Sequence, residues 1–273
     1  MVGYTVRVPN SGNPGRLLNG LKWDERVDPL SWQKIPTLFQ RASEHGISVS
    51  TIGEKRYQDT AFTTASLRGA KYLGANRQTE IVAQVKIALA EPASFAYVYV
   101  NGLDAAGHKD GVGSDKWLVA LEAVGELILQ IVNQLPKNTQ FFITADHGMV
   151  NPEEKIILGR DNPLMNHVTL VGGEPRARHI YLEPGSETDA TSLWREFLRD
   201  QVVIHTKQEA IDVGLFGEIV SDDCFARIGD LIAIPSENVL LIDPTRSAQE
   251  SAMVGHHGGL TDAEVVIPLL TAQ

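Results

Sequence analysis

In the sequence Phe95-Ala-Tyr-Val-Tyr-Val-Asn-Gly-Leu-Asp-Ala-Ala-Gly-His108, a short apolar run leads directly into a carboxylate and an imidazole. A second apolar run, residues 140–145, leads into the adjacent pair Asp146 and His147. Short apolar runs of this kind are typical of strands buried in a parallel sheet. We therefore expect two strands that each present polar, chemically capable side chains just past their carboxyl ends.

A long helix is predicted between these two strands. Ser114 is a suitable N-cap, residues 115–135 have amphipathic spacing, and Pro136 ends the helix. Strand, helix and strand in this order predict a right-handed parallel crossover, and the ligands of such sheets collect outside the carboxyl ends of the strands. The same reasoning predicts helices at 36–46 and 79–89 and a strand at 47–52. The fold class is therefore α/β, with a mainly parallel sheet flanked by helices.

The first candidate site is the pair Asp104 and His108, which meet on one face if the segment turns helically. Carboxylate oxygen and imidazole nitrogen are ligands that suit zinc and manganese. Gly102 and Gly107 would let the backbone bend close to an ion. The simpler alternative is a solvated loop acid beside a surface histidine.

Two further motifs carry candidate ligands. Asp146 and His147 can reach one ion only where the backbone leaves the extended form, which Gly148 permits. The alternative for this pair is a helix-capping acid followed by a hydrogen-bonded histidine. The distant sequence Val254-Gly-His-His-Gly-Gly-Leu-Thr261 offers a flexible loop from which one histidine can close a metal site.

Composition bounds the function. The chain has 273 residues and 43% apolar composition, so it can bury a full core. Its formal net charge is -10. An acidic protein lacks the positive surface that a nucleic-acid polymer or an anionic membrane needs. A small phosphate substrate remains compatible, because a metal pair supplies local positive charge.

The sequence also bears on the compartment. No stretch reaches the roughly 18 apolar residues of a membrane span. The single cysteine, Cys224, is expected to be a buried thiol, and the chain as written is expected to be cytoplasmic. Residues 2–19 read as a loop with an abrupt start. Export is the alternative if a signal sequence was lost together with an upstream segment.

The pattern changes to shorter strands and shorter helices after about residue 160. We therefore expect a metal-binding α/β core formed by residues 1–160 and 251–273. Residues 161–250 are expected to form a smaller α+β lobe.

In this order and with these gaps, the three motifs resemble the alkaline phosphatase superfamily, and within it the nucleotide pyrophosphatase/phosphodiesterase branch. The resemblance covers nearly the whole chain and implies an alkaline-phosphatase-like core. It also implies two divalent metal ions, zinc or alternatively manganese. One ion would be held by Asp104, His108 and His257, and the other by Asp146 and His147.

The resemblance implies a metal-dependent phosphodiesterase or nucleotide pyrophosphatase that acts on a small phosphodiester or nucleotide through a Thr or Ser nucleophile. The segment that carries this nucleophile, with a further carboxylate ligand, is not found in the sequence. It is expected upstream of Met1, and the chain alone is then weakly active or inactive. Thr63, Thr64 and Ser66 are alternative nucleophiles, although capping of their own helix explains them more simply.

Other functions remain open from the residues. A phosphomonoesterase or a cofactor-independent phosphomutase of the same superfamily would share the metal pair. A non-catalytic metal-binding domain is the alternative of a different class.

Overall fold

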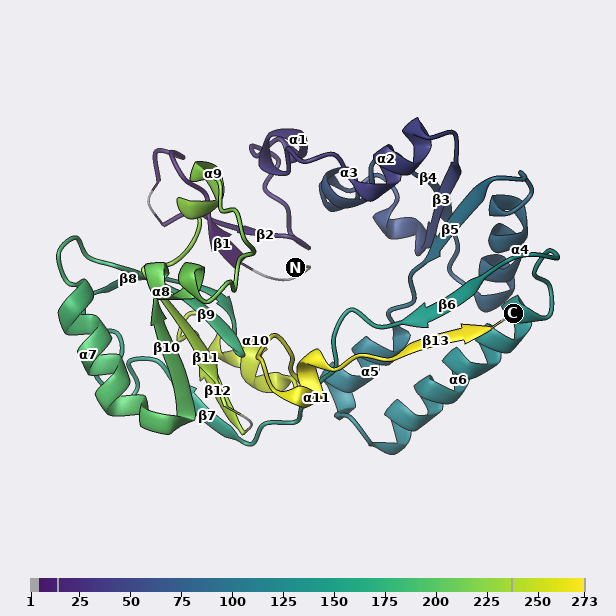
Figure 1. Ribbon diagram of the computed structural model, residues 1–273. Coiled ribbons are helices and arrows are strands. Elements are labelled where there is room, and N and C mark those ends of the chain that lie inside the picture. Colours follow the sequence, from purple (N-terminus) through teal and green to yellow (C-terminus); the bar gives the residue numbers. More distant parts are fainter. Residues whose placement is uncertain (1–4, 14, 237, 273) are drawn as a thin grey trace. The chain divides into compact units, whose positions relative to one another are not determined.

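The computed structural model describes residues 5–13, 15–236 and 238–272, and the chain divides into two compact units (Figure 1). The first unit comprises Met1–Lys22, Gly107–Val112 and Ala145–Ile267. The second unit comprises Trp23–Ala106, Gly113–Thr144 and Pro268–Gln273. The α/β fold class is confirmed, because each unit contains parallel strands together with helices.

The first unit is built on a four-stranded antiparallel sheet in the order β10-β11-β9-β8. Its strands are β8 (Val168–Glu174), β9 (Ala177–Leu182), β10 (Val202–Thr206) and β11 (Leu231–Pro235). Two smaller sheets belong to the same unit, the antiparallel pair β1 (Thr5–Arg7) and β2 (Leu17–Asn19) and the parallel pair β7 (Glu154–Ile157) and β12 (Val239–Ile242). The helices are α7 (Glu187–Leu198), α8 (Lys207–Asp212), α9 (Asp222–Phe225), α10 (Ser247–Ala252), α11 (Asp262–Val265) and the 3-10 turn η2 (Arg199–Gln201).

The core of the first unit forms where α7 packs against the sheet. Trp194 and Leu198 are on the buried face of α7 and are fully enclosed. They pack with apolar residues of β10, β11 and β12, among them Leu241, which is also fully buried. Burial of this kind removes apolar surface from water and is the main driving force for forming the unit.

The second unit contains a three-stranded parallel sheet in the order β4-β3-β5. Its elements are α1 (Pro29–Trp32), α2 (Leu38–Glu44), β3 (Ser48–Gly53), η1 (Lys55–Tyr57), α3 (Ala61–Leu67), β4 (Lys71–Gly74), α4 (Gln78–Ala88), β5 (Ser94–Val98), α6 (Asp115–Val132), β6 (Phe141–Thr144) and β13 (Leu269–Ala272). Helices α4 and α6 supply buried residues to one core with β3 and β4. Ser114 caps α6 by accepting a hydrogen bond from the backbone N–H of Trp117, as predicted.

The two strands of the expected parallel crossover, β5 and β6, belong to separate sheets in the structure. β5 pairs in parallel with β3, but β6 pairs antiparallel with β13. The final strand lies about 125 residues beyond β6 in sequence, so no local pattern revealed this partner. Helix α5 (Gly102–Asp110) follows β5, and its first turn belongs to the second unit while residues 107–110 belong to the first.

Three smaller expectations need comment. The segment read as a loop at 2–19 contains the hairpin β1–β2 in its described part, because Val6 and Leu18 pair across it. Cys224 is exposed rather than buried, since it lies in the one-turn helix α9. The compact units cut the chain at other places than 160 and 250, and the division into core and lobe stays a prediction.

Candidate metal centre

Helix α5 carries Asp104 and His108 one turn apart, as the i, i+4 spacing predicts. His108 Nδ1 lies 2.8 Å from the carbonyl oxygen of Gly255. A carbonyl can only accept a hydrogen bond, so Nδ1 carries the proton and donates it. This tautomer directs the lone pair of Nε2 towards a ligand. The hydrogen bond from Nδ1 to Gly255 fixes the ring, as is usual for metal-binding histidines.

The loop that carries the histidine pair docks on the end of α5. The backbone N–H of Val254 donates to His108 O at 2.8 Å, and that of Gly255 donates to Gly107 O at 3.2 Å. A Cβ at Gly255 would lie 2.4 Å from Gly107 O, which is too close for any other residue. Glycine is therefore required for this approach of loop and helix.

The two neighbouring histidines have different environments. His256 forms an antiparallel bridge with Val150, its side chain is 2% exposed, and burial lowers its pKa to about 4. The ring of His257 lies nearer to the ring of His108, with 5.0 Å between the centroids compared with 6.5 Å for His256. Burial, followed by the nearby His147 and His108, lowers the pKa of His257 to about 3. His257 is therefore neutral and presents a lone pair near pH 7.

Asp104, His108 and His257 form a group whose ligand atoms all lie within 4.8 Å of one another. Each contributes one oxygen or nitrogen atom, and all three side chains are half-buried. The continuous helix α5 sets the position of Asp104 relative to His108. One carboxylate and two imidazoles suit zinc or manganese. Within the described residues this is the one such group of three or more.

Asp146 and His147 lie beside this group but are not part of it. His147 stacks on His257, with ring centroids 3.5 Å apart and planes inclined by 11°. Its Nδ1 lies 2.8 Å from Gly148 O and its Nε2 lies 3.6 Å from Asp146 Oδ1. The Asp146 side chain is 66% exposed. The pair can contribute an oxygen and a nitrogen to a second ion but needs further ligands.

The sequence profile of the family described as type I phosphodiesterase / nucleotide pyrophosphatase matches residues 6–260. The chain belongs to this family. A search of curated proteins finds no match to this chain. The match runs through all three motifs, so the phosphodiesterase family is shown on the residues that suggested it.

Solved structures resemble this phosphodiesterase family member in fold. Murine ectonucleotide pyrophosphatase / phosphodiesterase 5, as an inactive variant in complex with AMP, has a TM-score of 0.64 and 16% identity, covering 85% of this chain and 62% of that one. Phosphonoacetate hydrolase from Sinorhizobium meliloti in complex with phosphonoacetate has a TM-score of 0.65 and 16% identity, covering 99% and 74%. The chain thus spans about three fifths of the length of the ectonucleotide pyrophosphatase.

Sequence reasoning missed a buried pair beside the motifs, Arg176 and Glu264, whose role is argued below. A local signal existed, because Thr261 and Glu264 have the spacing of a capping box. That signal would have misled, since the Thr261 hydroxyl donates to the Glu264 carboxylate and does not cap α11. The contact with Arg176 spans 88 positions and leaves no sequence pattern.

The hydroxyls of the alternative nucleophiles form hydrogen bonds with nearby backbone carbonyls. The hydroxyls of Thr63, Thr64 and Ser66 donate to the backbone carbonyls of Tyr57, Thr60 and Phe62. The expected capping role of these residues is wrong, because they lie inside α3 and Thr60 is the residue that caps it. These bonds favour the structural interpretation of all three hydroxyls.

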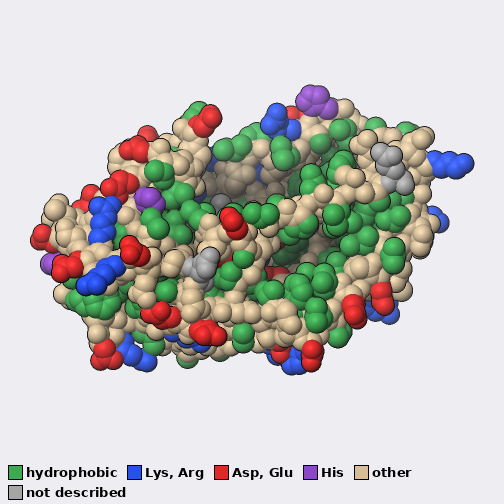
Figure 2. All heavy atoms as spheres, turned by 60° about the horizontal axis from the view of Figure 1, so that its bottom comes forward, with side chains coloured by type: hydrophobic (Ala, Val, Ile, Leu, Met, Phe, Trp, Pro, Cys, Tyr) green, Lys and Arg blue, Asp and Glu red, His purple; other side chains and the backbone are tan. Residues whose placement is uncertain are grey.

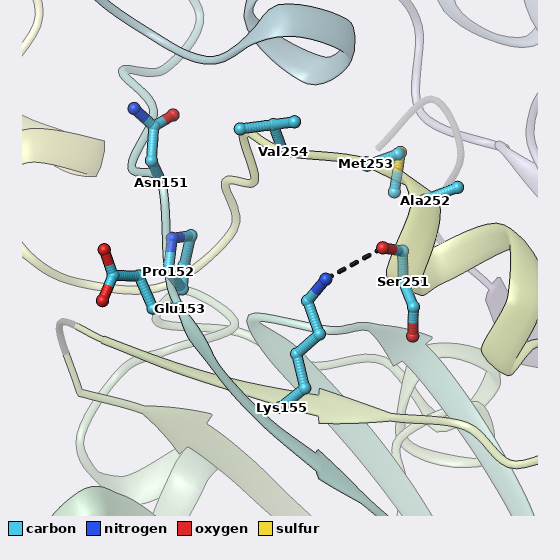
Figure 3. Close-up of a pocket in the computed structure, with 8 residues that line it drawn as sticks. All are labelled: Asn151, Pro152, Glu153, Lys155, Ser251, Ala252, Met253 and Val254. Atoms are coloured by element: carbon cyan, nitrogen blue, oxygen red, sulfur yellow. Dashed lines mark hydrogen bonds between the residues drawn. The ribbon is translucent and has the colours of Figure 1, made fainter.

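A shallow cavity of about 410 Å³ lies between residues 151–155 and residues 251–254 in the first unit (Figure 3). It is lined by Asn151, Pro152, Glu153, Lys155, Ser251, Ala252, Met253 and Val254. Lys155 Nζ donates to Ser251 O across it, at 2.9 Å. None of the candidate ligands lines this cavity, so it is not the candidate metal centre.

No helix in the described parts of the chain combines the length and the apolar character that crossing a bilayer requires.

Proposed function

We propose that this chain is the metal-binding part of a phosphodiesterase or nucleotide pyrophosphatase that hydrolyses a small phosphodiester. The observation that carries the proposal is the group Asp104, His108 and His257, brought together from two distant motifs. Asp146 and His147 would hold a second ion next to it. Zinc is the metal that this donor set favours, with manganese as the alternative.

When bound, the metal pair would supply positive charge for the phosphoryl oxygens and activate an attacking hydroxyl. The chain's own contribution is orientation. His108 is held by Gly255 and His147 by Gly148, so both rings keep one nitrogen directed away from the backbone carbonyl. Gly255 allows the loop that carries His257 to lie directly against Gly107, next to His108.

The proposal includes a Thr or Ser nucleophile and a further carboxylate ligand on a segment upstream of Met1. Exposed apolar side chains on the strands of the second unit support this part. Phe95 and Tyr97 on β5 and Phe142 on β6 have large exposed fractions, and Phe142 reaches 58%. Figure 2 shows many hydrophobic side chains, in green, at the surface on the right of the view. A further strand of the same protein would cover such a surface.

Metal binding is the first test. The purified chain should bind zinc, and His257→Ala should weaken the affinity by more than about 100-fold, because even the loss of an outer hydrogen-bond partner costs 10- to 100-fold. His256→Ala is the matched control and should change the affinity by less than about tenfold. Equilibrium dialysis against zinc, with elemental analysis, measures both. Equal losses for the two variants would show that the assignment of His257 is wrong.

Catalysis is the second test. The 273-residue chain and a form extended upstream of Met1 are assayed side by side with bis-p-nitrophenyl phosphate, a phosphomonoester and phosphonoacetate. The extended form should hydrolyse the diester in a zinc- or manganese-dependent way and lose the activity with chelator, whereas the shorter chain should be weak or inactive. Equal rates on the diester would place the nucleophile within residues 1–273. A preference of the extended form for the phosphomonoester or for phosphonoacetate would contradict the proposal of a phosphodiesterase.

A further inference from the structure

Arg176 and Glu264 form a fully buried ion pair in the first unit. Their side chains are 0% and 1% exposed, Arg176 Nε donates to Glu264 Oε1 at 3.0 Å, and Arg176 Nη2 donates to Oε2 at 2.7 Å. Two parallel bonds of this kind fix the relative orientation of the partners. Burying two charges is costly, however, so such a pair is weak evidence for a stabilising role. Its other contacts indicate a different role.

The Glu264 carboxylate holds the loop that carries His257. Oε1 accepts a hydrogen bond from the backbone N–H of Gly259 at 2.9 Å, and Oε2 accepts one from the Thr261 hydroxyl at 2.8 Å. A Cβ at Gly259 would lie 2.6 Å from Oε2, so the loop backbone rests directly on the carboxylate. Burial raises the pKa of Glu264, but hydrogen bonds from Arg176, Thr261 and Gly259 outweigh it and lower the pKa overall.

The backbone of the same residue holds the loop that carries His147. Glu264 O accepts a hydrogen bond from the N–H of Gly148 at 2.8 Å. A Cβ at Gly148 would lie 2.0 Å from the carbonyl oxygen of Ala263, which excludes any other residue there. One residue of α11 therefore fixes the residue after His147 by its backbone and the segment after His257 by its side chain.

Arg176 connects this arrangement to the core. Its Nη1 donates to the carbonyl oxygens of Ser236 and Val239, the latter at 2.8 Å. Val239 is the first residue of the buried strand β12. The links therefore run from a strand of the packed core through Arg176 to Glu264 and from there to both motif loops.

We propose that Arg176 and Glu264 are positioning residues that hold His147 and His257 in register with each other for metal binding. This inference rests on the proposed function, because it assumes that these histidines bind metal. The structure supplies a matched control in Arg178 and Glu250, a second ion pair with side chains 0% and 5% exposed. Those residues bond Leu241, Gly173 and Asp243 and make no hydrogen bond to residues 146–148 or 255–259 among the described contacts.

The test compares Glu264→Gln with Glu250→Gln in the full chain, first without metal. Hydrogen exchange is followed in peptides that cover residues 146–150 and 255–260. Glu264→Gln should accelerate exchange at Gly259 by at least about tenfold, because this amide loses its carboxylate acceptor. Exchange at Gly148 should accelerate by about two- to fivefold, because its acceptor, the backbone carbonyl of residue 264, remains but is no longer fixed by the ion pair with Arg176. Glu250→Gln should leave both loops within about threefold of the wild type while accelerating exchange around residue 243. Equal acceleration in both variants, or none in either, overturns the inference.

Zinc affinity provides the second measurement. Glu264→Gln should lose about 10- to 100-fold in affinity, as for other residues that orient metal ligands, and Glu250→Gln should retain it within about threefold. Equal affinity in the two variants, with zinc bound by the wild type, overturns the positioning role alone. Failure of the wild type to bind zinc contradicts the proposed function instead, and the exchange experiment still decides whether Glu264 orders both loops.

A milder variant covers the case in which Glu264→Gln does not fold. Thr261→Val keeps the shape of the side chain and removes one hydrogen bond to the carboxylate. It should accelerate exchange at Gly259 by about two- to fivefold and lower zinc affinity by a similar factor. Unchanged exchange and unchanged affinity in this variant would contradict the inference.

Discussion

The two units expose their apolar strands to different degrees. In the first unit, β11 and β12 are buried along their whole length, and a helix with fully enclosed residues packs with them. In the second unit, β5 and β6 alternate between half-buried and exposed residues, and three of the four residues of β13 are exposed. Both regions have apolar strand sequences, so the difference lies in what covers them. The loops at 146–148 and 255–259 belong to the first unit and are anchored to a completed core.

The largest effect is expected from leucine truncation in the two regions. Leu241 on β12 is 0% exposed, whereas Leu270 on β13 is 56% exposed. Leu241→Ala should lower the free energy of unfolding by about 2–5 kcal/mol, because it leaves a cavity in a packed core, and Leu270→Ala should change it by less than about 0.5 kcal/mol. Urea denaturation measures both.

The same leucine pair also sharpens the proposal of an upstream segment. In a form of the protein that contains this segment, Leu270→Ala should become clearly destabilising, by about 1 kcal/mol or more, if the added chain covers β13. A large loss for Leu270→Ala in the 273-residue chain itself would contradict the comparison.

A pH effect is expected in the covered sheet of the first unit. Burial, with a smaller contribution from Lys207, lowers the pKa of His179 to about 4 from 6.5. The unfolded chain therefore binds this proton first as the pH falls, and stability is lost from about pH 6.5 down to about pH 4, by at most roughly 1.4 kcal/mol per pH unit. His179 Nδ1 accepts the N–H of Gly229, and Asn can replace that acceptor.

His179→Asn should therefore reduce the acid dependence of the unfolding free energy while costing little above pH 7. Urea denaturation at several pH values compares the variant with the wild type. Parallel stability curves for the two proteins across this pH range would show that the sheet around His179 admits water.

Local patterns predicted the elements better than their partners. The helix predicted at 79–89 is α4, and the strand predicted at 47–52 is β3. These elements follow from periodicity and capping, which are properties of adjacent residues. The pairing of β6 with β13 was missed because a strand partner depends on contacts far along the chain, and the alternating burial of β6 is compatible with either direction.

The site shows the same limit. The resemblance predicted which of two adjacent histidines faces the other candidate ligands, and the structure places His257 with Asp104 and His108. The residue types alone left His256 and His257 open. Arg176 lay outside every motif, because its contribution comes from hydrogen bonds to residues 60 to 88 positions away. Gly148, Gly255 and Gly259 lie where the backbone approaches another segment closely, and these glycines can be seen in the sequence. The segments that they approach could not be named without the fold.

The smallest effect is expected from removing a helix cap, and it should be the same in both units. Ser114 caps α6 in the second unit, and Thr206 caps α8 in the first, each accepting a hydrogen bond from the backbone N–H three residues on. A cap satisfies one backbone donor of its own helix and does not depend on what covers the rest of the unit. Ser114→Ala and Thr206→Ala should therefore each lower the free energy of unfolding by about 1 kcal/mol.

Thr206 also belongs to a capping box, but the reciprocal bond goes from its own backbone N–H to Glu209 and survives the substitution. Urea denaturation of both variants checks this, with Thr206→Ser and Ser114→Thr as controls that keep the hydroxyl. A loss for Thr206→Ala several times that for Ser114→Ala would mean that the better covered unit amplifies even local defects, and the contrast between the units would then extend beyond packing.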